Sequence, residues 1–214
     1  MDTTTRILAI RHGETAWNVD TRIQGHLDIP LNDRGQWQAR RLARALATRD
    51  AIDAIYSSDL QRAHDTARAI AAATGAPLAT HAGLRERCFG RFEGRTYAEI
   101  EQTWPEESEH WRRRTPGWAP QGGESLLNMR ERIAQVLQEL ATRHPGQQIA
   151  LVAHGGVLDQ LYRLATGLEL QAPRTWQLGN TAVNRLLWTH QGLSLVGWAD
   201  TSHLEDDSLD EISA

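Results

Sequence analysis

Two histidines occupy matching positions in the sequence. His12 comes just after the apolar run at 6–10, His154 follows the apolar run at 148–153, and glycine comes directly after each. One isolated histidine is usually a residue of the core, but a matched pair at two strand ends weakens that explanation. Neutral imidazole is a good nucleophile toward phosphorus near pH 7, so phosphoryl transfer is a chemistry that such a pair could perform.

Groups that bind anions accompany these histidines. Arg11 stands beside His12, and Arg62 falls in the first turn of a predicted helix, where a solvated surface arginine is the alternative interpretation. Gly155 and Gly156 begin another predicted helix, so their backbone N–H groups and the helix dipole would attract an anion. Two arginines, two histidines and a helix N-terminus predict a pocket for a dianion such as phosphate.

Catalysis also needs an acid for the leaving group. Glu86 stands in a glycine-bounded loop among apolar residues, where partial burial or the charge of an incoming phosphate would favour its protonated form. Glu93 and Glu99 are also close in sequence, and each of the three could instead be a surface carboxylate. A histidine could then carry the phosphoryl group as phosphohistidine and later yield it to water.

The composition excludes several other classes of function. All 23 basic residues are arginine, so Schiff-base chemistry and a P-loop, which both need lysine, are excluded. The formal net charge of −4 disfavours general nucleic-acid binding. The single Cys88 excludes an internal disulfide and a thiolate-rich metal site.

The sequence also lacks the pattern of a membrane protein. It contains no apolar run near the roughly 20 residues that a membrane span requires. Residues 1–10 carry an early acid and no cationic region before a long apolar stretch, which is unlike a signal peptide. We therefore expect a cytoplasmic protein that binds no membrane.

Strand and helix patterns alternate along the chain. Strands are predicted at 6–10, 51–58, 76–81, 148–153, 182–188 and 193–199, and helices at 33–50, 59–75, 123–146 and 157–167. Gly192 makes a hairpin plausible between the last two strands. The acidic tail 204–214 is expected to be solvated. This order predicts an α/β fold with a largely parallel sheet, in which ligands bind beyond the carboxyl ends of the strands.

The stretch RHGETAWN at 11–18 resembles the signature of the histidine phosphatase superfamily, the phosphoglycerate-mutase-like clan. The similarity continues in the family's order through RIQGHLDIPLNDRGQWQA, IYSSDLQRAHDTA, LRERCFGRFEG, GGES and VAHGG, from about Arg6 to Gly156. Within the family, the chain resembles the small bacterial phosphatase branch, whose members are often labelled phosphoglycerate mutase, and this likeness includes the ending SHLEDDSLDE. Phe92 stands where tryptophan is common, and the pair Arg87-Cys88 is unusual, which casts doubt on the shape of the pocket wall.

The resemblance implies a role for each candidate residue. It makes His12 the phosphorylated nucleophile, Glu86 the proton donor, and Arg11, Arg62 and His154 the phosphate clamp. It adds Asn18 and Gln24 as polar contacts to the phosphate, with backbone help from Gly25 and Gly156. No metal and no cofactor are expected.

The resemblance also implies the architecture. We expect one domain over 1–214, an α/β three-layer sandwich with a mostly parallel mixed sheet, helices on both faces and a small helical cap at about 95–123. Within the cap, Trp104, Trp111 and Trp118 are expected to pack the interior as aromatic residues, with the alternative that one of them lines the substrate site. The run Arg112–Arg114 could meet a second anionic group of the substrate, although such a run is more often a solvated face.

Several functions remain open at this level. The short separation of 68 positions between Glu86 and His154, and the motif RIQG, favour a metal-independent phosphatase of a small phosphorylated metabolite over a cofactor-dependent phosphoglycerate mutase. Two further hypotheses are a non-catalytic phosphate-binding protein and a metal-dependent phosphohydrolase. The substrate is not indicated, nor is the choice between monomer and dimer.

Overall fold

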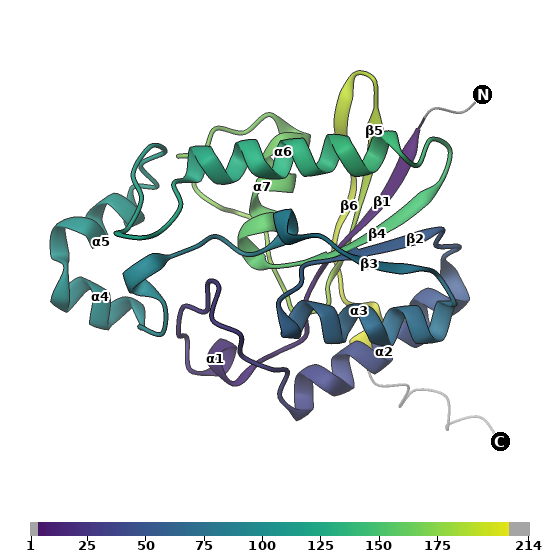
Figure 1. The fold of residues 1–214 in the computed structure, drawn as a ribbon, viewed down its shortest axis with the longest axis horizontal. Helices are drawn as coiled ribbons and strands as arrows, with labels where there is room; N and C mark the ends of the chain where they lie inside the picture. Colours follow the sequence, from purple (N-terminus) through teal and green to yellow (C-terminus); the bar gives the residue numbers. More distant parts are fainter. Residues whose placement is uncertain (1–3, 206–214) are drawn as a thin grey trace.

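The computed structural model describes residues 4–205 and, within them, a six-stranded mixed sheet (Figure 1). The strand order is β3-β2-β4-β1-β5-β6. The four parallel strands are β1 (Thr5–Arg11), β2 (Ala54–Ser57), β3 (Leu78–Thr80) and β4 (Gln148–Ala153). The antiparallel pairings are those of β5 (Val183–Thr189) with β1 and with β6 (Gly192–Asp200). Beyond Glu205, the acidic tail lies outside the described residues.

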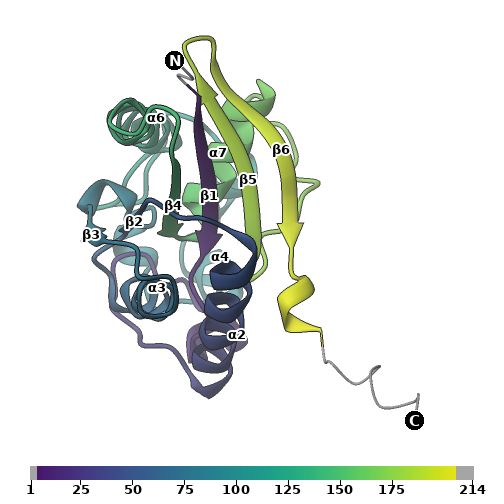
Figure 2. The same cartoon turned by 90° about the vertical axis from the view of Figure 1, so that its right-hand side faces the viewer.

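Helices cover both faces of this sheet, as Figures 1 and 2 show. One face packs against α2 (Asp33–Arg49) and α3 (Gln61–Thr74). The other packs against α6 (Leu126–Thr142) and α7 (Gly155–Thr166). The predicted three-layer α/β fold with a mostly parallel mixed sheet is confirmed.

Strand β1 lies in the middle of the sheet and is buried on both faces. Ile7 and Ala9 pack into the core under α6 and α7, whereas Leu8 and Ile10 pack into the core under α2 and α3. A strand covered on both sides needs apolar residues at every position. The continuous apolar run before His12 therefore reflects its place between two helical layers.

Two predicted helices begin or end differently from expectation. α3 begins at Gln61, not at Asp59, because the Asp59 carboxylate accepts hydrogen bonds from Arg85. The exposed N–H of Gln61 donates instead to Asp28, 2.7 Å away. α6 ends at Thr142, three residues before the Pro-Gly pair that was expected to end it.

The remaining elements are short. The predicted hairpin joins β5 and β6, and Gly192 lies at its turn with a φ of 119° that favours glycine. Helix α1 (Ala16–Val19), which the sequence patterns do not predict, is closed by a capping box between Thr15 and Asn18. Single 3₁₀ turns occur at Ala82–Leu84, Gly90–Phe92 and Ser202–Leu204.

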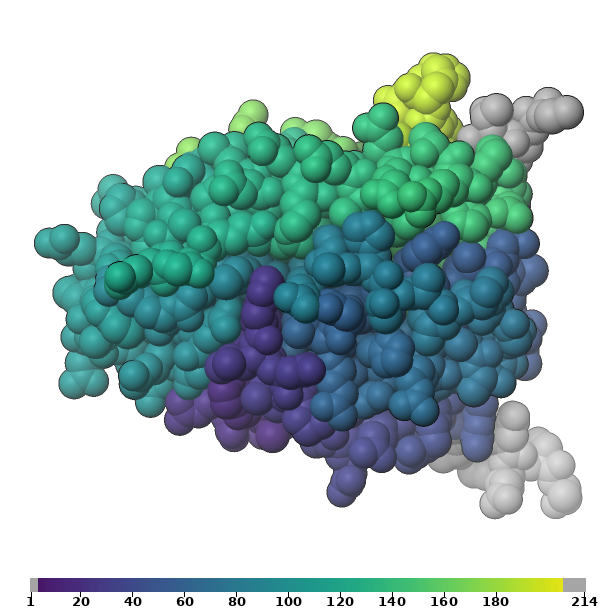
Figure 3. Space-filling model, viewed as in Figure 1, coloured from purple at the N-terminus to yellow at the C-terminus, as the bar shows by residue number. Residues whose placement is uncertain are grey.

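The segment with α4 (Tyr97–Thr103) and α5 (Pro105–Arg112) lies at the left of Figure 1. Its core is aromatic: the Phe92 ring lies 5.6, 5.6 and 5.9 Å from the rings of Trp104, Trp111 and Trp118. In Figure 3 the purple segment after β1 lies beside this teal segment, and a backbone bridge joins Arg22 to Thr96. No helix within residues 4–205 is long and apolar enough to cross a membrane.

Candidate active site

The pairing of β1 with β4 brings the two histidines together. The two strands are parallel, with Arg11 opposite Ala153, so that His12 and His154 follow at the same sheet edge. The backbone N–H of His12 donates to the Ala153 carbonyl at 3.0 Å, and the two imidazole rings lie 5.2 Å apart. Both residues are almost wholly buried, with exposed fractions of 3% and 0%.

The surroundings of His12 set its charge and its tautomer. Burial, with the charges of Arg11 and Arg62, lowers the pKa of His12 well below 6.5, so the ring is neutral at pH 7. Its Nδ1 lies 2.7 Å from the carbonyl oxygen of Gly13. Because a carbonyl can only accept, Nδ1 carries the proton, and Nε2 keeps the lone pair of a nucleophile.

His154 is also neutral, and its ring has no partner. Burial lowers the pKa of His154 well below 6.5, and the charges of Arg62 and Arg11 lower it further. Neither ring nitrogen makes a hydrogen bond to any residue in the described part of the chain. An unpartnered buried polar group costs about 1–3 kcal/mol, which a hydrogen bond to a phosphoryl oxygen would offset.

The two arginines are held by backbone carbonyls. Arg62 donates to the carbonyls of Gly25 at 2.8 Å and Leu27 at 2.9 Å, and Arg11 donates to the carbonyl of Leu178. Burial lowers the pKa of both guanidinium groups below the ordinary value of arginine. Carbonyls do not neutralise a cation, and neither arginine forms an ion pair among the described residues, although the charge of Glu86 acts on both. In each of them Nε has no hydrogen-bond partner among residues 4–205.

Glu86 occupies the N-terminus of α7. Its two carboxylate oxygens lie 3.1 and 3.0 Å from the Gly156 backbone nitrogen, whose N–H they accept, and one also accepts from the Arg87 N–H at 2.7 Å. An N–H at the first turn of a helix is a binding site for anions. The Glu86 carboxylate therefore takes the place that the sequence analysis expected a phosphate to take.

The structure separates Glu86 from the other two candidate acids. Glu93 accepts hydrogen bonds from the N–H groups of His26 and Phe89, both at 3.0 Å, and so ties its own loop to the loop of His26. Glu99 closes the capping box at the start of α4 and pairs with Arg22 at 3.1 Å. Of these three carboxylates, only Glu86 lines a cavity at the site.

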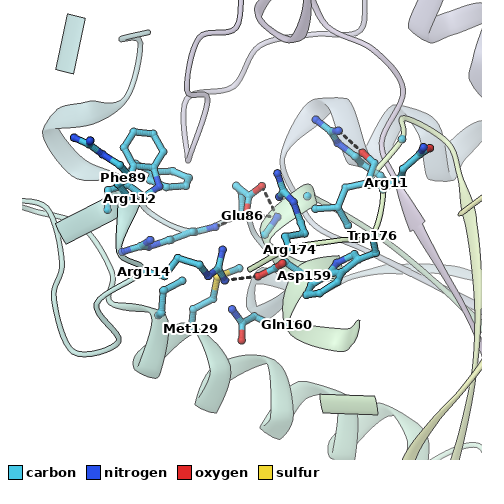
Figure 4. Close-up of a pocket in the computed structure, with 18 residues that line it drawn as sticks. Arg11, Glu86, Phe89, Arg112, Arg114, Met129, Asp159, Gln160, Arg174 and Trp176 are labelled. Atoms are coloured by element: carbon cyan, nitrogen blue, oxygen red, sulfur yellow. Dashed lines mark hydrogen bonds and ion pairs between the residues drawn. The ribbon is translucent and has the colours of Figure 1, made fainter. Parts of the chain in front are cut away.

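Two cavities share residues at this site, and Figure 4 shows the side chains that line the larger one. The smaller, of about 150 Å³, is lined by the predicted residues Arg11, His12, Asn18, Gln24, Gly25, Arg62 and Glu86, with Arg22, Ile23 and Phe89. The larger, of about 850 Å³, shares Arg11, Glu86 and Phe89 with it and extends along Gly155 and Gly156 toward α5 and α7. His154 lies behind His12 and lines neither.

The predicted polar contacts lie at the smaller cavity. The Asn18 side-chain oxygen accepts from the Thr15 N–H at 3.0 Å, and the buried Gln24 oxygen has no partner among the described residues. Gly25 has a φ of +51°, and a Cβ there would lie 2.1 Å from Glu93. Only glycine fits this position, which keeps the Gly25 carbonyl available to Arg62.

Sequence reasoning missed residues that hold the nucleophile and the acid in place. The Asn180 amide donates to the His12 carbonyl at 2.9 Å, and the Thr181 N–H donates to the Arg11 carbonyl at 2.9 Å. His26 Nε2 donates to the Glu86 carbonyl at 2.8 Å. These residues lie in loops, where no periodic pattern marks them. Within residues 4–205, no group of three or more His, Cys, Asp or Glu side chains is arranged to hold a metal ion.

Comparison with known proteins agrees with this geometry. The family model of the histidine phosphatase superfamily (branch 1) matches residues 7–201. The chain is 40% identical to phosphoglycerate mutase-like protein 4 of Arabidopsis thaliana, over 94% of this chain and 87% of that protein. It is 36% identical to a metal-independent phosphoserine phosphatase of the same plant, over 94% and 83% of the two chains.

A solved structure supports the same relationship. Phosphoserine phosphatase from Entamoeba histolytica, solved in complex with 3-phosphoglyceric acid, superposes with a TM-score of 0.84 at 30% identity, covering 94% of this chain and all of that one. The matching family model, the curated relatives and the fold agree with the motifs around His12, Arg62, Glu86 and His154. The chain belongs to the histidine phosphatase superfamily.

Proposed function

We propose that this protein hydrolyses phosphate monoesters of small metabolites through a phosphohistidine formed on His12. The observation that carries the proposal is the state of His12: a neutral ring whose Nδ1 bonds to the Gly13 carbonyl, which leaves the Nε2 lone pair free. The charges of Arg11 and Arg62 stand beside it. The phosphatase activity named for the plant and amoebal relatives supports the assignment.

The first chemical step forms the phosphoenzyme. Nε2 of His12 attacks phosphorus, the bond from phosphorus to the ester oxygen breaks, and the leaving oxygen takes a proton from Glu86. Arg11, Arg62 and neutral His154 stabilise the phosphoryl oxygens, and the N–H of Gly156 points to the same place.

The second step returns the enzyme to its starting state. Water attacks the phosphohistidine, its proton passes to the Glu86 carboxylate, and the bond between phosphorus and Nε2 breaks. Inorganic phosphate leaves, and Glu86 again holds the proton for the next substrate. The step uses the side chains already present and needs no external acid.

Binding of phosphate at α7 would displace Glu86 from the Gly156 N–H. The freed Glu86 side chain then lies beside the leaving oxygen, to which it gives the proton that it holds. The substrate itself would thus prepare Glu86 to act as an acid. This exchange explains how one helix N-terminus serves a carboxylate and a phosphate in turn.

We also propose that residues of about 95–123 form a cap over the site within one domain spanning 1–214. The α4–α5 segment contributes Trp111 and Arg112 to the wall of the larger cavity, which supports this role. The cytoplasmic location, and the absence of nucleic-acid, metal and cofactor binding, stay predictions from the sequence. The oligomeric state stays open between monomer and dimer.

Trapping the intermediate tests the proposal. Rapid quenching with labelled substrate should give an acid-labile, alkali-stable phosphate adduct at residue 12. His12→Ala should fold, form no adduct and lose at least about 1,000-fold in kcat, since the covalent route then has no nucleophile. His190→Ala changes an exposed histidine of the β5–β6 hairpin and is the matched control. A His12→Ala enzyme that keeps its activity would exclude the mechanism.

A further inference from the structure

The larger cavity carries an excess of positive charge. Its wall contains five arginines, Arg11, Arg87, Arg112, Arg114 and Arg174, and two carboxylates, Glu86 and Asp159. A phosphate bound near His12 reaches only the end that the two cavities share. The other arginines face space that the phosphoryl group of a substrate does not fill.

Arg112 and Arg114, two members of the run Arg112–Arg114, already form ion pairs with carboxylates of the protein. Arg112 pairs with Glu101 at 3.2 Å and Glu109 at 3.1 Å. Arg114 pairs with Asp159 at 2.6 Å and donates to the carbonyl of Leu170. Their charges are largely compensated inside the protein, so this run is a poor candidate for binding a second anion.

Arg87 is buried and forms no ion pair among the described residues, although the charges of Glu124 and Glu86 favour its cationic form. It is only 4% exposed, and its guanidinium donates to the carbonyls of Glu124 at 2.8 Å and Trp118 at 3.5 Å. Burial lowers its pKa to about 10, which reflects the cost of a cation away from water. No carboxylate of the described residues lies within ion-pair distance of Arg87.

Arg174 lies across the same cavity. It makes no hydrogen bond or ion pair with any residue of the described chain, and its charge helps to lower the pKa of Arg11. Figure 4 shows this exposed arginine among the residues that line the cavity. Arg174 is therefore an unpaired cation, among the described residues, within electrostatic reach of the phosphate clamp.

We propose that Arg87 and Arg174 bind a second anionic group, a carboxylate or a second phosphate, on the organic part of the substrate. This rests on the proposed function. The planar guanidinium fork matches both groups, and Phe89, Leu126 and Met129 give an apolar wall for the carbons between the two charges. A volume of about 850 Å³ leaves room for more than a three-carbon chain.

Matched substrates test the subsite. 3-Phosphoglycerate carries a carboxylate where glycerol 3-phosphate carries a hydroxymethyl group, and fructose 1,6-bisphosphate adds a phosphate to fructose 6-phosphate. In at least one pair, we expect the member with the second anionic group to have a kcat/KM at least about tenfold higher than its partner. The pair that shows the preference identifies the second group as carboxylate or phosphate.

Substitution of single arginines tests which residues cause the preference for a second anionic group. Arg174→Gln should reduce the preference at least about tenfold, mainly by raising KM for the substrate with two anionic groups. Arg87→Gln should act in the same direction, and if it fails to fold, Arg174→Gln decides alone. Arg113→Gln removes the same charge from an arginine whose side chain is 72% exposed, pairs with Glu109 and lies outside the cavity wall. This control should leave the preference unchanged.

These experiments distinguish failure of the second-anion site from failure of the proposed phosphatase function. Equal kcat/KM within both substrate pairs, or a preference that survives Arg174→Gln, would overturn the second-anion site. Hydrolysis of p-nitrophenyl phosphate through an adduct on His12 would still support the proposed function in that case. A wild-type protein that forms no adduct with any of these phosphate esters would overturn both.

Discussion

His12 and His154 depend on burial for the charge state that the chemistry requires. Each ring is neutral because the protein removes it from water and surrounds it with arginines, and only neutral imidazole can attack phosphorus. The same burial makes the fold sensitive to acid. Function and stability are thus linked through the same two side chains.

We expect the free energy of unfolding to fall as the pH drops below about 6.5, the ordinary pKa of histidine. The pKa of each ring is lower in the folded state, so below about pH 6.5 the unfolded chain binds more protons, and stability rises with pH. Each histidine contributes a slope of up to about 1.4 kcal/mol per pH unit. Urea unfolding at several pH values, from one unit above the ordinary histidine pKa to one unit below it, measures this slope.

His12→Gln is the control for this pH dependence. It should show a shallower slope below the ordinary histidine pKa, because one of the buried rings no longer titrates. His203, whose pKa burial also lowers, should contribute to the slope that remains. A wild-type free energy of unfolding that stays constant over this range would contradict the prediction.

The role of Glu86 as an acid can be measured through the leaving group. Glu86→Gln should reduce kcat/KM at least about 100-fold for glycerol 3-phosphate, whose alkoxide needs a proton to leave. It should reduce kcat/KM less than about tenfold for p-nitrophenyl phosphate, because nitrophenolate leaves without protonation. Glu93→Gln is the matched control, since Glu93 accepts from backbone N–H groups of its own region and lines neither cavity. Equal losses with both substrates would assign the proton to another group.

The elements of the fold differ in how far the sequence determines them. His12 and His154 could be predicted to meet because each follows a continuous apolar run, and such runs become neighbouring parallel strands. The start of α3 could not be predicted, because it depends on the pairing of Asp59 with Arg85, 26 positions away. No local sequence pattern reveals such a contact. Asn180 likewise reaches His12 from a loop, so its role depends on tertiary structure alone.

The first turn of α7 is the element on which the exchange of Glu86 for phosphate depends. In Gly156→Ala, the added Cβ would lie 2.2 Å from a Glu86 carboxylate oxygen and 3.1 Å from the Met129 methyl carbon. We expect a loss of kcat/KM of about tenfold or more for glycerol 3-phosphate, because the carboxylate is forced from its place. The melting temperature should not fall by more than a few degrees, because alanine favours the helix.

Gly197→Ala is the control for this variant, since a Cβ at that position would have no heavy atom within 4 Å. It should retain wild-type kcat/KM. Full activity of Gly156→Ala would show that catalysis does not depend on the contact between Glu86 and the first turn of α7.

At the scale of the whole molecule, the choice between phosphatase and mutase depends on access of water to the phosphohistidine. The cap segment is interrupted by Pro105, Pro116 and Gly122, and only 68 positions separate Glu86 from His154. The larger cavity, of about 850 Å³, adjoins the smaller one at Arg11 and Glu86. Water should therefore reach the intermediate before a second hydroxyl group does.

We expect 3-phosphoglycerate with catalytic 2,3-bisphosphoglycerate to give little 2-phosphoglycerate, while phosphate is released from at least one small phosphomonoester. Enolase-coupled detection measures isomerisation, and a molybdate assay measures phosphate. Both rates should be insensitive to EDTA, and vanadate should inhibit. Isomerisation much faster than phosphate release across the substrates would establish a mutase instead.

The central position of β1 has a consequence for synthesis on the ribosome. β1 is made before the other strands of this sheet, yet its neighbours β4 and β5 are among the later ones. Its apolar residues must wait unpaired until most of the chain has emerged, and such long-range pairing forms slowly. The nascent chain thus carries the nucleophile before the rest of the sheet is made, but it cannot become an enzyme until β4 and β5 enclose β1. Premature termination before β4 therefore leaves a fragment that exposes an aggregation-prone strand and has no active site.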